Sequence, residues 1–175
     1  GERLMSPHGG LRKTPGRLDQ LIQQVTSEFQ SRTPGVQIPV PVPPCTVVLD
    51  QDRFRIMLRN ILDNALRHSE ADDPPVHLSA QETPGGILLI IEDHGCGIPP
   101  HDLPHIFEPF YRVDKSRSKE TGGYGLGLNL VHKIVSAHGG SITLDSTLGR
   151  GTTVRIKLPS SPVDPADHPR KVQTS

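Results

Sequence analysis

The stretch Gly86–Pro99, GILLIIEDHGCGIP, decides the fold. It begins as an apolar strand, reaches an acid at position 93, and continues into a Gly-x-Gly turn. The turn signal TPGG (83–86) separates this strand from VHLSAQE (76–82), so the two segments are predicted to form a β-hairpin. The sheet that this hairpin begins must be completed by other strands of the chain.

Segments on both sides of the hairpin have the spacing of helices or the composition of strands. Asp50 or Asp52 is predicted to cap the second helix, and Gly139 with Gly140 to end the third. The expected helices lie within 18–29, 54–66 and 126–138, and the expected further strands within 45–50, 141–146 and 152–159. This order predicts an α/β fold, a two-layer sandwich in which a mixed sheet packs on helices.

Composition limits the class of protein. The 175 residues carry 19 Lys+Arg and 19 Asp+Glu, and this zero net charge argues against a nucleic-acid partner. No segment reaches the length of a membrane span and none has the pattern of a secretory signal, so the fragment is expected to be soluble and cytoplasmic. Cys45 and Cys96 are interpreted as free thiols.

Glycine and proline divide the chain into a domain and two flanks. Eleven of the 18 prolines lie before residue 45 or after residue 158, whereas 12 of the 17 glycines lie between Gly85 and Gly151. The sequence therefore predicts a domain at 17–159, with a disordered linker at 1–16 and a disordered tail at 160–175. The polar, weakly periodic segment at about 99–123 is predicted to be a long functional loop.

Asn60, Asn64 and Arg67 share one face of the second helix, at positions i, i+4 and i+7. Carboxamide oxygens suit a hard cation such as Mg²⁺, and an arginine fork suits phosphate. Taken alone, the same pattern also fits a solvated polar face.

Two glycine-rich segments are further candidates for a site. Asp93 ends its strand before Gly95 and Gly97, and a carboxylate there can accept hydrogen bonds from an exocyclic amine such as that of adenine. The glycines would let the base lie against the backbone; the alternative is an ordinary Asp-x-Gly turn. The segment GGYGLGLNLVHKIV (122–135) runs into a helix, where free backbone amides favour an anion, although a flexible helix-start loop also fits.

Together these motifs resemble the catalytic domain of bacterial sensor histidine kinases. The N, G1, F, G2 and G3 boxes of that family are matched in order by Asn60–Asn64, Asp93–Gly97, IFEPFYRVD (106–114), Gly123–Gly127 and Gly149–Thr152. The resemblance implies a Bergerat-type fold of the gyrase, Hsp90, histidine kinase and MutL (GHKL) superfamily. It also implies ATP and Mg²⁺ as cofactors and a mobile ATP lid at about 99–123.

The resemblance also implies a role for each matching residue. Asn64, with Asn60, would hold Mg²⁺, and Arg67 and Arg112 would meet the phosphates. His68 stands where the family often has tyrosine. The nucleotide would further contact Asp93, Gly95, Gly97, Ile98, Tyr111, Gly123, Gly125, Leu126, Gly127, Leu128 and Thr152.

The N box favours phosphotransfer over hydrolysis. Hydrolases of the superfamily carry a glutamate base where this chain has Asn60, and asparagine cannot take a proton near neutral pH. None of the nine histidines has the context of a phosphoacceptor. The resemblance therefore implies partners: a separate dimerisation and phosphoacceptor-histidine domain, and a response regulator receiver domain. The parent protein is expected to be a homodimeric inner-membrane sensor. The alternatives are a GHKL-type ATPase or protein Ser kinase, and a nucleotide-binding docking module without catalysis.

Overall fold

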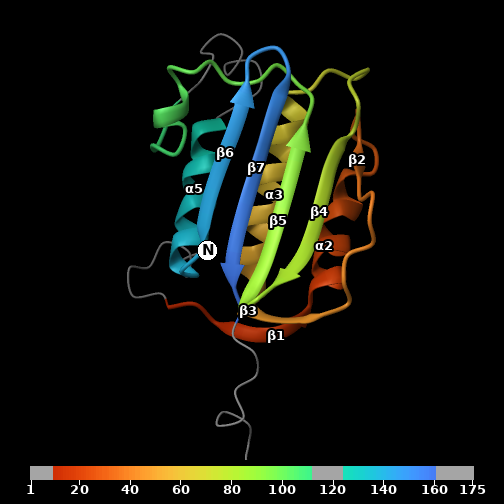
Figure 1. Cartoon of the computed structure of the whole chain (residues 1–175), viewed down its shortest axis with the longest axis vertical. Coiled ribbons are helices and arrows are strands. Elements are labelled where there is room, and N and C mark those ends of the chain that lie inside the picture. The colour runs from red at the N-terminus through yellow and green to blue at the C-terminus, as the bar shows by residue number, and fades with distance from the viewer. Residues whose placement is uncertain (1–9, 112–123, 161–175) are drawn as a thin grey trace, which may run out of the picture.

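The computed structural model describes residues 10–111 and 124–160, with only the backbone given for 124–127. The described chain forms two layers, a five-stranded sheet and a layer of helices (Figure 1). In Figure 1 the open face of the sheet is turned to the viewer, and helices α2, α3 and α5 lie behind it. The predicted α/β sandwich is confirmed.

The sheet has the order β2-β4-β5-β7-β6 and contains both kinds of pairing. Strand β2 pairs parallel with β4, whereas the other neighbours pair antiparallel. The strands are β2 (Val36–Gln37), β4 (Val76–Thr83), β5 (Gly86–Asp93), β6 (Ser141–Thr147) and β7 (Gly151–Pro159). Both expected hairpins, β4–β5 and β6–β7, are therefore confirmed, and the edge strand β2 is an addition.

The helices place their apolar faces against the sheet. They are α2 (Leu18–Thr26), the 3₁₀ turn η1 (Ser27–Phe29), α3 (Gln51–Arg67), the 3₁₀ turn η2 (Leu103–His105) and α5 (Tyr124–Ala137). Asp50, and not Asp52, caps α3, because its side chain accepts a hydrogen bond from the Arg53 amide. The hydrophobic core between the layers includes Phe54 and Leu89, both without exposed surface.

A small second sheet corrects the expected start of the domain. Strand β1 (Lys13–Arg17) pairs antiparallel with β3 (Thr46–Asp50), so part of the segment expected as a linker is ordered backbone. A proline and a glycine lie inside β1, which is why its composition resembles a linker. Ser160, placed by the sequence in the tail, accepts a hydrogen bond from the Val48 amide (2.8 Å). Residues 1–9 and 161–175 lie outside the described part.

A buried polar cluster joins β1, β3, α3 and α5 at this end of the molecule. The Asp50 carboxylate is 1% exposed and accepts from the backbone amides of Arg12 (2.9 Å) and Arg53 (3.1 Å). The Arg53 guanidinium lies 3.8 Å away and is buried as well. Directly after α5, His138 Nε2 accepts from the Asp50 amide (3.2 Å). Asp50 therefore links the segment before β1, the start of α3 and the residue that follows α5 through direct contacts.

The described residues include neither a membrane-spanning helix nor a disulfide. Within 10–111 and 124–160, no helix has the length and hydropathy needed to cross a bilayer. Neither cysteine forms a disulfide there, as expected; Cys45 precedes β3 at one end of the molecule, and Cys96 belongs to the loop after β5.

Candidate functional site

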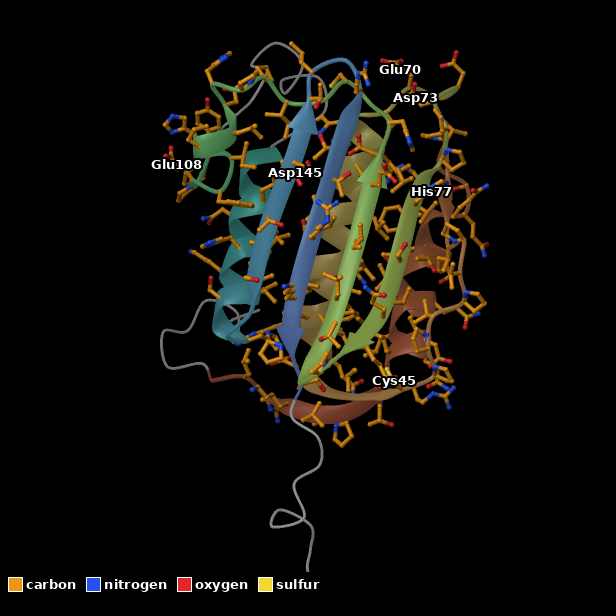
Figure 2. All side chains as sticks on the ribbon, in the orientation of Figure 1. Cys45, Glu70, Asp73, His77, Glu108 and Asp145 are labelled. Carbon is orange, nitrogen blue, oxygen red and sulfur yellow. The ribbon has the colours of Figure 1, made fainter. Side chains whose placement is uncertain are left out.

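The candidate residues gather at the end of the sheet opposite the β1–β3 pair. Here α3 ends at Arg67 and β5 ends at Asp93, and the turn between β6 and β7 lies at the same end. Figure 2 shows Glu70 and Asp73 at the same end, on the loop that follows α3. The loop after β5 is fixed between these elements, since the Cys96 amide donates to His68 O (3.1 Å) and Cys96 O accepts from the Gly149 amide (2.7 Å).

Asp93 is the principal charged group of this site. It is 6% exposed, and its Oδ1 accepts from the Gly95 amide (3.0 Å). Burial raises the pKa of this carboxyl to about 6, because desolvation disfavours the charged form; hydrogen bonds from the backbone amides of Gly95 and Thr152 oppose the rise only in part. Among the described residues it forms no ion pair. The sequence placed this acid correctly at the end of the strand.

The two glycines after Asp93 are explained by the protein itself. A Cβ on Gly95 would lie 2.1 Å from His68 O, and a Cβ on Gly97, where φ is +74°, would lie 2.2 Å from Thr147 O. The space that a side chain would fill is therefore occupied by α3's end and by the β6–β7 turn. The missing side chains therefore allow close backbone packing. That a base lies against this backbone stays a prediction.

Ser146 is a site residue that the sequence analysis missed. Its Oγ accepts from the Ile98 amide (2.7 Å), donates to Gly151 O (3.1 Å) and lies 2.8 Å from Thr152 Oγ1. Thr152 is 8% exposed and is paired with Asp93 in the β5–β7 register. The signal was present in the sequence: in β6, Ile142 and Leu144 mark the inward face, and Ser146 continues that alternation.

On α3, the two asparagines predicted to hold Mg²⁺ lie one helical turn apart. Asn60 Nδ2 donates to Ile56 O (2.7 Å), and because a carbonyl only accepts, the amide nitrogen must face the helix. Asn60 Oδ1 is thereby directed away from that carbonyl. Asn64 lies one turn further along, half-buried. Two carboxamide oxygens on neighbouring turns fit a Mg²⁺ ion that keeps most of its waters.

Arg67 is held by a carboxylate on the same helix. Its Nε donates to Asp63 Oδ2 (2.8 Å), while Arg32 donates to Asp63 Oδ1 (3.1 Å). The side chain expected to meet phosphate is therefore engaged with Asp63 here, and phosphate would have to compete for it. His68 forms the C-cap of α3. The His68 carbonyl accepts from the Cys96 amide and so fixes the loop after β5.

The start of the expected lid is packed onto the domain. The Tyr111 hydroxyl donates to the buried carboxylate of Asp102. Phe107 stacks on His132 of α5, with ring centroids 5.1 Å apart, and its carbonyl accepts from Asn129 Nδ2 (2.9 Å).

Beneath that segment, Ile98, Ile106 and Leu128 form a small apolar cluster. Ile98 and Leu128 thus join the site as packing residues. Phe110, by contrast, is 74% exposed.

The phosphate side of the site is described in part. Arg112, Gly123 and the second half of the expected lid, residues 112–123, lie outside the described residues. Helix α5 begins at Tyr124, two residues earlier than predicted, so Gly125, Leu126 and Gly127 belong to its first turn. The first backbone amides of a helix have no partner within it, which suits an anion at this position.

Comparisons with known proteins agree with this arrangement. Residues 49–162 match the family described as Histidine kinase-, DNA gyrase B-, and HSP90-like ATPase. The chain belongs to this family. Within the histidine kinase-, DNA gyrase B- and HSP90-like ATPases, it is similar to Sensor histidine kinase WalK of Bacillus subtilis (strain 168), with 41% identity over 114 residues. It is also similar to the signal transduction histidine-protein kinase ArlS of Staphylococcus haemolyticus (strain JCSC1435), with 42% identity over 113 residues.

Solved structures of this ATPase family superpose on the chain. The mycobacterial sensor histidine kinase MprB has a TM-score of 0.71 at 30% identity, covering 86% of this chain and 99% of the MprB chain. Full-length ShkA in complex with AMPPNP has a TM-score of 0.73 at 28% identity, covering 91% of this chain and 34% of the ShkA chain. The predicted relationship to sensor histidine kinases is confirmed.

The match to full-length relatives is partial. It covers 65% of this chain in both sequence comparisons, but 19% of WalK and 25% of ArlS. The chain thus spans about a fifth to a quarter of the length of these kinases.

Proposed function

We propose that this chain is the ATP-binding catalytic domain of a two-component sensor histidine kinase. In the whole protein it would transfer the γ-phosphate of ATP to a histidine, for relay to an aspartate of a response regulator. Asp93 carries the proposal. A nearly buried carboxylate, held by backbone amides and without an ion pair among the described residues, suits the two N–H donors of an adenine amino group.

The remaining site residues divide between the base and the phosphates. Asn60 and Asn64 would hold Mg²⁺, and Arg67 and Arg112 would orient the phosphates. Bound Mg·ATP would supply the transferable phosphoryl group and the divalent charge that offsets its oxygens. The base would be enclosed by His68, Asp93, Gly95, Gly97, Ile98, Tyr111, Leu128 and Thr152, and the phosphates by Gly123, Gly125, Leu126 and Gly127.

Asn60 supports phosphotransfer over hydrolysis. Its amide nitrogen is committed to Ile56 O, and its oxygen can bind a cation but cannot take a proton from water near neutral pH. A GHKL-type ATPase would need a base in that position. A docking module that binds nucleotide would also use a Mg²⁺ site, so a phosphorylation assay is needed to separate that alternative from a kinase.

Nucleotide titration tests the first part of this proposal. Isothermal titration calorimetry of the chain with ATP should show binding that Mg²⁺ strengthens. Asn64→Ala should remove the Mg²⁺ dependence and leave the metal-free affinity unchanged; Gln81→Ala, which removes an exposed carboxamide from β4, is the matched control. Equal Mg²⁺ dependence in Asn64→Ala and the unchanged chain would contradict the metal assignment.

A phosphorylation assay then separates kinase from ATPase and docking module. With labelled ATP the chain alone should take up little label, since no histidine has the acceptor context. Adding the dimerisation and phosphoacceptor domain of its parent protein should produce an acid-labile phosphohistidine on that domain. Sustained release of phosphate without that domain would favour an ATPase, and binding without either reaction would favour a docking module.

The partners and location follow the same proposal. The parent protein would be a homodimer whose dimerisation domain carries the histidine, located in the inner membrane with this domain in the cytoplasm. The identity of 41% to 42% to WalK and ArlS supports this proposal.

A further inference from the structure

Ser146 is the hydrogen-bonding centre of the turn beside Asp93. It sits half-buried on β6, opposite Thr152 in the β6–β7 register. Three groups surround its hydroxyl: the Ile98 amide at 2.7 Å, Gly151 O at 3.1 Å and Thr152 Oγ1 at 2.8 Å. A serine hydroxyl has one proton and two lone pairs, so three neighbours use its whole capacity.

The chemistry of the neighbours fixes the direction of each bond. The Ile98 amide can only donate, so it takes one lone pair of Ser146 Oγ. Gly151 O can only accept, so it takes the single proton of Ser146. The remaining bond must then be donated by Thr152 into the second lone pair of Ser146. The Thr152 proton is therefore committed, and Thr152 Oγ1 can only accept from any other partner.

We propose that Ser146 is a positioning residue that sets the adenine selectivity of the site by holding Thr152 as an acceptor. This inference rests on the proposed function, in which Thr152 and Asp93 meet the base. Both groups then present acceptors: a carboxylate and a threonine oxygen whose proton points elsewhere. Two acceptors match an amino group at position 6 of a purine and oppose an oxo group there.

The selectivity test compares ADP with IDP, which carries hypoxanthine with an oxo group at position 6. In Ser146→Ala the Thr152 proton is released and can turn toward that oxo group. The ratio of dissociation constants, IDP over ADP, is expected to fall about tenfold, the effect of one hydrogen bond gained in place of a repulsion. Calorimetry with Mg²⁺ measures both constants, and Ser141→Ala, on the exposed start of β6, should keep the original ratio.

Two further comparisons separate a positioning role from a structural one. Ser146→Thr keeps the hydroxyl and should keep the ratio, whereas Ser146→Val, which is nearly isosteric with the threonine variant, should lower it. These two variants also decide the matter if Ser146→Ala does not fold. In a Thr152→Val background, Ser146→Ala should change the ratio no further, because Ser146 acts through Thr152.

The outcomes of this test distinguish the inference from the proposed function. Equal ratios in Ser146→Thr and Ser146→Val, with ADP still bound, would overturn the inference and leave the proposed function intact. A further fall of the ratio in the Thr152→Val background would also overturn it. An unchanged chain that binds neither ADP nor IDP would overturn the proposed function itself.

Discussion

Two buried aspartates lie at opposite ends of the molecule, and their surroundings differ. Asp50, at 1% exposure, accepts from two backbone amides and faces the buried guanidinium of Arg53 at 3.8 Å. Asp93, at 6% exposure, has backbone amides but no ion pair among the described residues. The first carboxylate is compensated by the fold, whereas the second retains a desolvation cost that raises its pKa to about 6.

The difference separates a structural acid from a binding acid. A compensated carboxylate joins elements together, here β1, β3, α3 and α5 through Asp50. A carboxylate left short of partners has capacity for a ligand and carries a free-energy cost until the ligand arrives. Substitutions of each aspartate, and changes of pH, test this difference.

Removing Asp50 should have the largest effect on stability. Asp50→Ala removes the cap of α3 and leaves the Arg53 charge buried, so we expect the free energy of unfolding to fall by about 3–5 kcal/mol. Asp50→Asn keeps a good capping residue, so its free energy of unfolding should fall by less. Urea unfolding measures both. The control is Asp52→Ala on the same helix turn, whose side chain is 74% exposed and whose loss should cost under about 1 kcal/mol. Equal losses in Asp50→Ala and Asp52→Ala would contradict the comparison.

The pH dependence of stability should differ at the two ends. The pKa of Asp93 is raised to about 6 in the folded state, against about 3.9 when unfolded. Between these values the folded state binds more protons, so the Asp93 contribution falls as pH rises from about 4 to 6, by about 2–3 kcal/mol in all. In Asp93→Asn this fall is absent. Its stability relative to the unchanged chain should therefore rise over that window, as urea unfolding at several pH values would show.

His138, at the other end, should act in the opposite direction. Burial lowers the pKa of His138, although its bond to Ile134 O and the Asp50 charge oppose this while Lys13 and Arg53 support it. Below the ordinary pKa of about 6.5, the unfolded state therefore binds more protons than the folded state. The contribution of His138 to stability is lost as pH falls from about 6.5 toward the lower pKa of the folded state. In His138→Gln the loss on the acid side should be smaller. Identical pH profiles for His138→Gln and the unchanged chain would contradict this assignment.

Of the two buried aspartates, Asp50 and Asp93, only Asp93 should affect ligand affinity. Asp93→Asn replaces an acceptor by a carboxamide that presents donors as well, and ADP affinity is expected to fall about tenfold to a hundredfold, as for hydrogen bonds to a charged group. Calorimetry measures the affinity, and circular dichroism should show an unchanged fold. Glu92→Gln, the exposed neighbouring acid on β5, is the control and should bind ADP normally. An unchanged ADP affinity in Asp93→Asn would remove the adenine assignment.

Much of the fold follows from patterns within short segments. The β4–β5 hairpin was predictable because alternation and a turn signal are local, and α3 because its apolar stripe repeats over 17 residues. Strand β1 was not predictable, since a strand containing Pro15 and Gly16 exists only because β3 lies beside it. That pairing is a tertiary contact, and composition alone predicted a linker.

The site divides in the same way. The positions of Asp93 and the asparagines came from local spacing, whereas Ser146 required knowing that β6 places it against Ile98, 48 residues earlier in the chain. Gly95 and Gly97 are likewise found from local spacing, but the carbonyls of His68 and Thr147 that lie beside them belong to other segments. Long-range neighbours thus decide what a correctly located residue contacts.

Asp63 is a solvated aspartate that can be compared with the two buried ones, and its substitution should have the smallest effect. This carboxylate is 33% exposed and is compensated by two arginines, Arg67 at 2.8 Å and Arg32 at 3.1 Å. Because the pairs are solvated, Asp63→Asn should change the free energy of unfolding by less than about 1 kcal/mol. It would, however, release the Arg67 guanidinium, and ATP affinity should rise about twofold to fivefold, the equivalent of losing one surface ion pair as a competitor. Asp52→Asn, which breaks an ion pair with Arg55 at the other end of α3, should leave ATP affinity unchanged. If ATP affinity in Asp63→Asn stays the same or falls, Arg67 does not exchange Asp63 for phosphate. Ion pairing within the protein would then decide whether a buried aspartate such as Asp50 or Asp93 can bind a ligand. It would not decide whether Arg67, paired with the solvated Asp63, can bind phosphate.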